Sequence, residues 1–418
     1  MNLKTSDPKM AKLIASQAKY EQETLDLIPS ENYASSAVRE ALGSVLTDKY
    51  AEGYSHKRYY AGQINIDQVE DLAKERALKM FGLSADKWHV NVQPYSGSPA
   101  NLEIYFALLK FGDKVLGMKL DQGGHITHGL PIGFSGTAYK FISYGVNPKT
   151  EILDYDEILK IARREKPKMI VCGATAYSRE INFKIFSDIA KEVGAYLLAD
   201  ISHIAGLIVA GVHPSPFPYA DVVMATTHKT LRGPRGAIII CKNKVLPDGE
   251  ALAKKIDRAV FPGMQGGPHE NQIGAMAVCF GENLKPAFKN YGSQIIKNAR
   301  VLSEELTKKG LRIVSGGTDN HLMLVDLRPI KMTGKDAQQK LEEINIICNK
   351  NTIPFDPEKP FIGSGIRLGT PALTTRGMKE KDMKNIANLI FITLTSQESP
   401  AKIKAEVLKL CRQFPIKV

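Results

Sequence analysis

The sequence has 418 residues, an apolar fraction of 43%, a charged fraction of 24% and a formal net charge of +12. These fractions are close to the averages of globular proteins, and the length is enough for two domains. No apolar run approaches the length of a membrane span, and the first residues, MNLKTSDPKMAKLI, lack the apolar core of a secretory signal. We therefore expect a cytoplasmic protein that does not associate with membranes.

The positive charge is compatible with binding an anionic partner such as nucleic acid. The lysines are spread along the whole chain without interleaved aromatic residues, which favours a solvated surface, so no nucleic acid is expected. The five cysteines are Cys172, Cys241, Cys279, Cys348 and Cys411. They form no C-x-x-C pair, so no metal site or redox motif is indicated, and we expect them in the core of a protein from a reducing compartment.

The first 25 residues read as an N-terminal arm containing a helix. Asp7 suits the N-cap of that helix and Pro8 suits its first position. From about residue 65, short apolar runs alternate with amphipathic stretches, which indicates an α/β fold. The predicted strands are 114–118, 168–173, 194–200, 220–227 and 236–241, and the predicted helices include 99–110, 152–165 and 182–193.

This alternation predicts a large domain over residues 26–280, with a mostly parallel sheet covered by helices on both faces. One helix is expected to run through 270–306. Apolar runs at 311–314 and 321–327 and a helical C-terminus then predict a smaller α/β domain over residues 281–418.

Lys229 directly follows an apolar strand in the stretch ADVVMATTHKTLRGPRG (220–236). In open α/β sheets, ligands bind at the carboxyl ends of the strands. Burial there, with Arg232 and Arg235 nearby, favours the neutral amine, which is the form that attacks a carbonyl carbon. A solvated lysine in a surface turn is the alternative, and this stretch alone does not exclude it.

A second strand, in GAYLLADISH (194–203), ends on Asp200, with His203 three residues later. A carboxylate at this position suits the pyridinium nitrogen of a pyridoxal cofactor, because a protonated ring is the stronger electron sink. A helix N-cap for Asp200 and a core position for His203 are the alternatives.

Three further stretches carry candidate binding groups. Ser96, Gly97 and Ser98 precede a predicted helix, whose first N–H groups form an anion site that suits a phosphate. YAEGYSHKRYY (50–60) places Glu52, a candidate general acid–base, among tyrosines, although an RNA-stacking loop has a similar composition. Arg367 is the single arginine of the glycine-rich loop GSGIRLGTP (363–371), where it suits a carboxylate or an ordinary surface turn.

Together, these stretches closely resemble the serine hydroxymethyltransferases, pyridoxal-phosphate enzymes with an aspartate-aminotransferase-like fold. The resemblance covers residues from about 25 to 415. Its motifs are SENYAS (30–35), YAEGY and KRYY (within 50–60), GGHITHG (123–129), AGVHPSPFPYAD (210–221), THKTLRGPRG (227–236), FPGMQGGP (261–268) and SGIRLGTPALTTRG (364–377).

The resemblance implies transfer of the hydroxymethyl carbon between serine and tetrahydrofolate, or a related reduced pterin, with glycine as the other product. It also implies a homodimer with active sites shared between chains. The catalytic residues implied are Lys229 as the Schiff-base lysine, Asp200, Glu52, His228 and Tyr60. The cofactor contacts implied are Ser96, Gly97, Ser98, His125, Thr175, His203 and His228, with Tyr50, Gly266 and Gly267 from the partner chain. The substrate contacts implied are Ser30, Tyr60, Glu52 and Arg367 for the amino acid, and Leu120, Gly124, His125, Ile126, Asn351, Lys359, Pro360 and Phe361 for the pterin.

The chain departs from the usual family pattern beside the pterin loop, where Asp121-Gln122 stands in place of Ala-His. This change leaves the one-carbon carrier open between tetrahydrofolate and a modified pterin. Two other functions remain as alternatives. One is a pyridoxal-phosphate aldolase that acts on β-hydroxy amino acids without a pterin, and the other is a basic RNA-binding protein.

Overall fold

The computed structural model describes residues 2–417. The chain contains two compact units: Ala34–Ser293, and Met1–Tyr33 together with Gln294–Val418. The expected N-terminal arm therefore groups with the C-terminal part of the chain, and the domain limits proposed from the sequence stay a prediction. Within residues 2–417, no helix has the combination of length and apolar character needed to cross a bilayer.

The unit Ala34–Ser293 is built on a seven-stranded sheet with the order β4-β10-β9-β8-β7-β5-β6. The strands are β4 (Trp88–Asn91), β5 (Lys114–Met118), β6 (Lys140–Tyr144), β7 (Met169–Cys172), β8 (Tyr196–Asp200), β9 (Val222–Thr226) and β10 (Ala237–Lys242). Strand β10 is antiparallel to both of its neighbours, and the other pairs are parallel. The predicted α/β fold with a mostly parallel sheet is confirmed.

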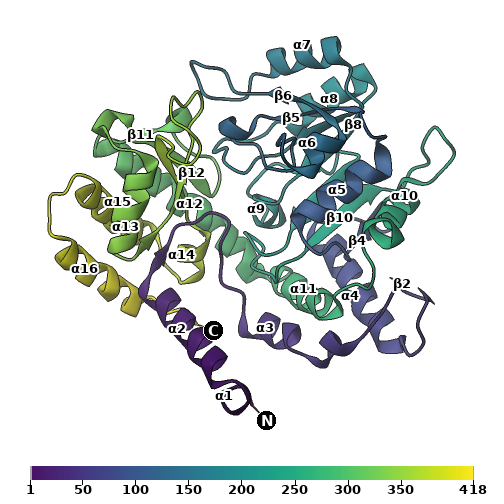
Figure 1. Ribbon diagram of the computed structural model, residues 1–418, viewed down its shortest axis with the longest axis horizontal. Coiled ribbons are helices and arrows are strands. Elements are labelled where there is room, and N and C mark those ends of the chain that lie inside the picture. The colour runs from purple at the N-terminus through teal and green to yellow at the C-terminus, as the bar shows by residue number, and fades with distance from the viewer. Residues whose placement is uncertain (1, 418) are drawn as a thin grey trace. The chain divides into compact units, whose positions relative to one another are not determined.

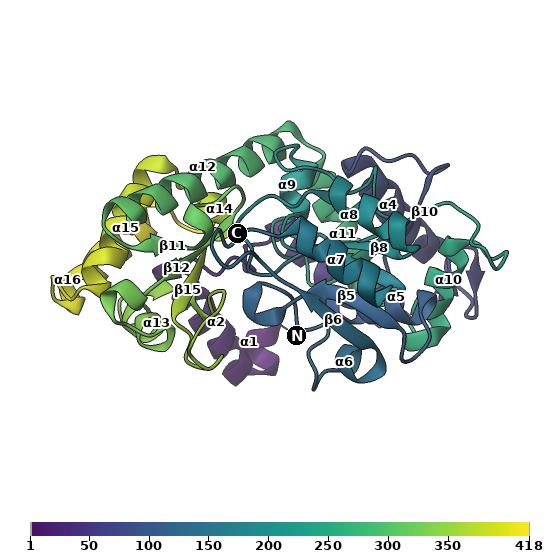
Figure 2. The same cartoon turned by 90° about the horizontal axis from the view of Figure 1, so that it is seen from above.

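Helices cover both faces of this sheet, which explains why its strands are apolar almost throughout. On one face, α5 (Gly97–Leu108) and α10 (Leu252–Arg258) pack into a buried cluster with alternate residues of β5, β7, β8, β9 and β10. Helices α7 (Tyr155–Glu165) and α8 (Phe183–Val193) lie beside each other (Figure 2). Because α8 contacts β7 and β8 without contributing to that cluster, it covers the opposite face.

The prediction of one helix through 270–306 is wrong. Helix α11 (Glu270–Asn283) ends before α12 (Pro286–Lys308) begins. Proline has no N–H group to continue a helical hydrogen-bond pattern, but it suits the first turn of a new helix. The remaining elements of this unit are α3 (Ser36–Leu42), η1 (Val45–Asp48), β2 (Gly53–Tyr54), β3 (Lys57–Arg58), α4 (Ile64–Met80), η2 (Leu120–Gln122), α6 (Phe134–Ala138), α9 (Ala205–Val209) and η3 (Ala259–Met264).

The other unit contains a four-stranded antiparallel sheet with the order β11-β12-β15-β14. Its strands are β11 (Arg312–Ile313), β12 (Leu322–Asp326), β14 (Asn349–Asn351) and β15 (Gly365–Gly369), and β1 (Leu25–Asp26) pairs in parallel with β13 (Ile346–Ile347). Its other elements are α1 (Leu3–Ser6), α2 (Pro8–Glu23), η4 (Val314–Gly316), η5 (Arg328–Ile330), α13 (Gly334–Glu343), α14 (Pro371–Thr375), α15 (Glu380–Leu394) and α16 (Pro400–Gln413).

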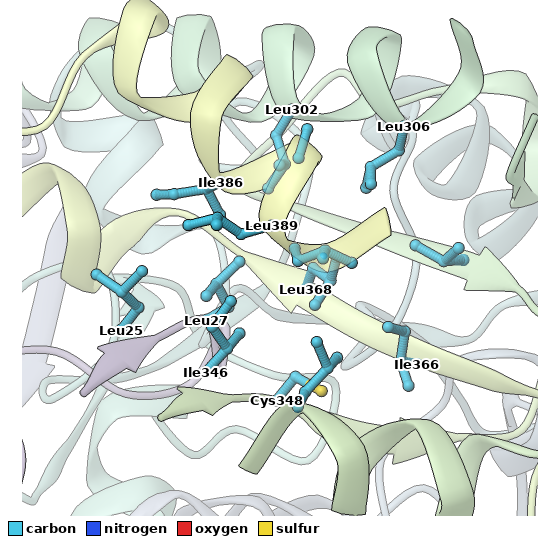
Figure 3. Close-up of a cluster of buried hydrophobic side chains, with 14 of the residues drawn as sticks. Leu25, Leu27, Leu302, Leu306, Ile346, Cys348, Ile366, Leu368, Ile386 and Leu389 are labelled. Carbon is cyan, nitrogen blue, oxygen red and sulfur yellow. The ribbon is translucent and has the colours of Figure 1, made fainter. Parts of the chain in front are cut away.

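The core of this unit joins both ends of the chain. Figure 3 shows Leu25 and Leu27 beside Ile346, in a cluster that also holds Ile386 from α15. The predicted N-terminal helix is confirmed as α2, and the Asp7 side chain accepts a hydrogen bond from a backbone N–H of its first turn. All five cysteines are buried, as the sequence predicts.

Candidate active site

Lys229 lies in the connection between β9 and β10, and its side chain is buried. Hydrogen bonds from Thr227 N to Gly236 O (3.1 Å) and from Gly233 N to Thr227 O (2.7 Å) hold this connection in place. Lys229 lines a small pocket at the carboxyl ends of the strands. The other lining residues are Gly97, His125, Ala174, Thr175, Asp200, Ser202, His203, Met224 and Thr226.

Asp200, the last residue of β8, is a buried carboxylate in this pocket. It accepts hydrogen bonds from Asn101 Nδ2 (3.0 Å) and from the backbone N–H of Ser202 (3.1 Å), and His128 Nε2 lies 3.2 Å from its Oδ2. Burial raises the pKa of Asp200, but the hydrogen bonds and positive charge around it, those of His128 first, together outweigh burial and hold the pKa well below its usual value. Asp200 is thus a buried negative charge held in a fixed position.

His125 lines the same pocket with a neutral ring. Burial, and then the nearby His128, lower the pKa of His125 to about 4. Its Nδ1 atom lies 2.7 Å from Thr127 Oγ1, which fixes the orientation of the ring. A flat, uncharged side chain held in this way can pack against the face of another aromatic ring.

The N-terminus of α5 opens onto the pocket. The Ser96 side chain does not cap the helix, so the first N–H groups of α5 are left for a bound group. Gly97 is required here, because an added Cβ would lie 2.5 Å from Thr226 Cγ2. His228, beside Lys229, has a buried Nδ1 atom with no hydrogen-bond partner among the residues described. Burial, and then the charge of Lys229, lower the pKa of His228 to about 3.

The structure also brings His203, Thr175 and Ser98 to this region. His203 and Thr175 line the pocket, and Ser98 lies in the first turn of α5. The backbone oxygen of His203 accepts a hydrogen bond from Thr230 Oγ1 (3.1 Å), which ties the segment after β8 to the Lys229 turn. The predicted cofactor residues from these strand ends therefore lie together.

Five other predicted residues of this unit form a second cluster that does not contribute to the lining of the Lys229 pocket: Tyr50, Glu52, Tyr60, Gly266 and Gly267. A Cβ atom added to Gly266 would lie 3.4 Å from Glu52 Oε1, and one added to Gly267 would lie 3.2 Å from Tyr50 Cε1. The rings of Tyr50 and Tyr60 meet edge to face, with centroids 5.1 Å apart. The charge of Glu52 raises the pKa of Tyr50. Both tyrosines are exposed, so the cluster faces outward.

Arg367 and Ser30 belong to the unit formed by the two ends of the chain. Arg367 is buried on β15, and its Nη2 donates to Asn349 Oδ1 (3.0 Å). Burial lowers the pKa of Arg367 to about 10, so the guanidinium remains charged at neutral pH. The segment that carries Ser30 runs along the end of the same strand, because Gly369 N donates to Leu27 O (2.8 Å).

The predicted pterin contacts are divided between the two units. Leu120, Gly124 and Ile126 lie in or just after η2 in one unit, where the two apolar side chains are exposed. The others lie in and after β14 in the second unit: Asn351, Lys359, Pro360 and Phe361. Phe361 is 85% exposed, which is unusual for a large apolar side chain.

The unusual pair Asp121-Gln122 has local partners. Gln122 is buried, and its Oε1 accepts a hydrogen bond from Val146 N (2.9 Å). Asp121 pairs with Lys119 at 3.0 Å. Both side chains thus contribute to holding the loop that contains Leu120 and Gly124.

Sequence reasoning did not identify His128 and Asn101, which hold Asp200. The available signal was GGHITHG, in which His128 stands three residues after His125, as the second histidine of a motif already noted. Ligand atoms of His125, His128 and Asp200 lie within 4.8 Å of one another. His128 and Asn101 already engage Asp200, and this arrangement suits a carboxylate that faces a charged ring.

The comparison with known families agrees with this geometry. Residues 3–390 match the family model described as serine hydroxymethyltransferase, which covers the Lys229 pocket, the Glu52 cluster and the Arg367 strand. Enzymes of this family use pyridoxal phosphate to interconvert serine and glycine, with tetrahydrofolate as the co-substrate for one-carbon transfer. The chain therefore belongs to the serine hydroxymethyltransferase family of pyridoxal-phosphate-dependent transferases.

Proposed function

We propose that this chain transfers the hydroxymethyl carbon of serine to tetrahydrofolate or a related reduced pterin, with Lys229 as the lysine that holds the cofactor. The observation that carries this proposal is the Lys229 pocket. The pocket is lined by a buried amine, that of Lys229, and by the Asp200 carboxylate, whose ionised form His128 favours. The uncapped N-terminus of α5 borders it.

The residues present fit pyridoxal phosphate. Lys229 would bind the aldehyde carbon, Asp200 would pair with the ring nitrogen and His125 would pack on the ring. The first turn of α5, with the unpartnered Nδ1 of His228, would hold the phosphate. When bound there, the cofactor supplies an electron sink for the bond that is cleaved at the α-carbon of serine.

Arg367 would bind the serine carboxylate, because its planar guanidinium can form two parallel hydrogen bonds to a carboxylate. Its buried position strengthens this attraction, since little water screens it. Ser30 and Tyr60 would add hydrogen-bond donors. Glu52 would take the proton of the serine hydroxyl as the hydroxymethyl group leaves, and would return it to the pterin intermediate.

We place the Glu52 cluster in the active site of a partner chain in a homodimer. Tyr50, Glu52, Gly266 and Gly267 lie together, yet none of them lines the Lys229 pocket of its own chain. Their outward position suits a contribution to a second copy. The exposed side chains Leu120, Ile126 and Phe361 would cover the flat apolar faces of the pterin.

The test is the conversion of serine to glycine with no pterin, with tetrahydrofolate and with a modified pterin. We expect conversion to depend on a pterin and to be lost in Lys229→Ala. Glu52→Gln should lower the pterin-dependent rate by about 10²–10⁴-fold, whereas the exposed control Glu40→Gln should match the parent. Serine cleavage at an equal rate without any pterin would instead identify the aldolase alternative.

A further inference from the structure

The backbone around Glu52 is held unusually firmly for a surface connection. Four consecutive carbonyl oxygens accept hydrogen bonds from protein donors instead of water. The pairs are Gln63 Nε2 to Tyr50 O (2.9 Å), Arg58 Nη1 to Ala51 O (2.8 Å), Tyr59 N to Glu52 O (3.0 Å), and both Gln93 Nε2 (2.9 Å) and Arg58 Nη1 (3.2 Å) to Gly53 O.

Gly53 contributes to the same restraint. Its φ of +101° lies in the region that favours glycine, and an added Cβ would lie 2.4 Å from Lys57 O. The segment 50–53 therefore has one tightly packed conformation, so the side chain of Glu52 projects from it in a defined direction.

Two of the donors to this segment meet on one buried carboxylate of α4. Arg58 Nη1 and Gln93 Nε2 lie 3.0 Å and 2.8 Å from Glu70 Oε1, and Arg58 Nε donates to Asp67 Oδ1 at 2.9 Å. Arg58, Gln93 and Glu70 are almost fully buried as side chains. Loss of one partner would leave a buried charge or donor unpaired, which is costly.

Helix α11 brings a second buried acid to this group. α11 packs along α4 (Figure 1), and Glu270, its first residue, has Oε1 3.8 Å from Arg58 Nη1. Burial, and then the charge of Glu70, raise the pKa of Glu270 to about 9. Four further side chains of this group form ion pairs with one another, and His56 and Asp71 border them. The positive side chains are Arg58 and Lys74, and the negative ones are Asp67 and Glu70.

The same acid stands close in the chain to the glycine segment that lies beside Glu52. Glu270 follows Gly266 and Gly267 closely in the chain, and Gly266 approaches Glu52 Oε1. The buried group thus holds the Glu52 segment and lies close in the chain to the glycine segment, both of which we assign to the partner's active site.

We propose that Arg58, Glu70 and Glu270 are positioning residues that hold the Glu52 segment where its carboxylate can exchange a proton with the substrate. The proposal rests on the role proposed above for Glu52. None of the three residues needs to touch the substrate, because Arg58 acts on the backbone of residues 51 and 53. Glu70 bonds Arg58, and Glu270 packs 3.8 Å from it.

The variants compare charge, shape and geometry. Arg58→Lys keeps the charge but loses the planar fork. Glu70→Gln keeps the shape but removes the charge that Arg58 requires. Glu270→Ala removes the side chain, and Glu270→Gln restores an uncharged group of the same shape. The matched control is Glu75→Gln, an exposed carboxylate on the same helix as Glu70.

Three quantities are measured on the cofactor-loaded enzyme: kcat and KM for pterin-dependent serine conversion, cofactor absorbance, and hydrogen–deuterium exchange of peptides spanning residues 50–60. We expect Arg58→Lys and Glu70→Gln to lower kcat by about 10²-fold, as displaced catalytic groups do. The KM for serine and the absorbance should stay close to the parent values, and the amide of Tyr59 should exchange faster. Glu270→Gln should recover most of the activity that Glu270→Ala loses.

The proposal would be overturned if hydrogen–deuterium exchange of residues 50–60 were unchanged in both Arg58→Lys and Glu70→Gln. It would also be overturned if turnover fell only in proportion to the cofactor lost. If the parent enzyme shows no pterin-dependent turnover, the proposed function fails. The exchange measurement still decides whether this group holds the Glu52 segment, so the two failures can be distinguished.

Discussion

Replacing Glu103 with glutamine should stabilise the protein at alkaline pH and change little at acidic pH. Glu103 lies within α5 and is fully buried, and neither carboxyl oxygen has a hydrogen-bond partner among residues 2–417. Burial raises the pKa of Glu103 from 4.5 to about 8. Between these values the folded state keeps a proton that the unfolded chain has released, so the stability of the fold decreases as the pH rises.

The size of the effect follows from the same two values. Each pH unit between the unfolded and folded pKa costs about 1.4 kcal/mol, so the total loss reaches about 5 kcal/mol. The loss is absent below the unfolded pKa and complete above the folded pKa of about 8. Glutamine has nearly the same shape and stays neutral, so the advantage of Glu103→Gln should grow across this range.

The assay is urea unfolding of the parent and of Glu103→Gln at about pH 4 and about pH 8.5, on either side of the transition. We expect nearly equal midpoints at the lower pH and a clearly higher midpoint for the variant at the higher pH. Glu40→Gln, at an exposed position of α3, is the matched control and should show no such divergence. Parallel pH curves for the parent and Glu103→Gln would refute the reasoning, because the folded protein would then tolerate the charged carboxylate.

Three further predictions concern the active site. Borohydride reduction of the cofactor-loaded enzyme, followed by peptide mapping, should place the cofactor on Lys229, and a label on any other lysine contradicts the assignment. Arg367→Lys keeps the charge but loses the two parallel hydrogen bonds, so the Kd for serine should rise by about tenfold or more, with normal cofactor absorbance. Serine affinity equal to that of the parent would rule out this role. Lys229→Ala and Glu52→Gln chains should be nearly inactive alone and regain activity when mixed, and proven heterodimers without activity would refute a shared site.

Five strands of the large sheet could be predicted closely because their residues are buried on both faces. Strand β5 has the predicted bounds, and β7, β8, β9 and β10 lie within one or two residues of their apolar runs. The antiparallel direction of β10 was not predicted, since a run of apolar residues has the same appearance in either direction. The break between α11 and α12 was missed because the amphipathic pattern continues across it, although Pro286 was a visible signal.

The residues of the Lys229 pocket could be predicted where they directly follow a strand. Lys229 and Asp200 are examples, because the ends of parallel strands meet at one edge of the sheet. The partners of Asp200 could not be found in this way. His128 precedes it by 72 residues and Asn101 by 99, and only the packing of α5 and of the loop after β5 brings them to the carboxylate.

The Glu52 segment shows why a catalytic role is easier to predict than the structure that supports it. A carboxylate among tyrosines can be recognised in the sequence from its residue types. A backbone carbonyl, by contrast, can accept a hydrogen bond from any donor that the fold brings near. The sequence therefore sets no preference for Arg58 and Gln93 as donors to the carbonyl of Gly53. The raised pKa of Glu270 also cannot be predicted from the sequence, because it depends on burial and on the charge of Glu70, which act only after α11 has packed on α4. If these long-range contacts hold Glu52 as proposed, changes in two helices away from the substrate will alter the proton transfer more than they alter substrate binding.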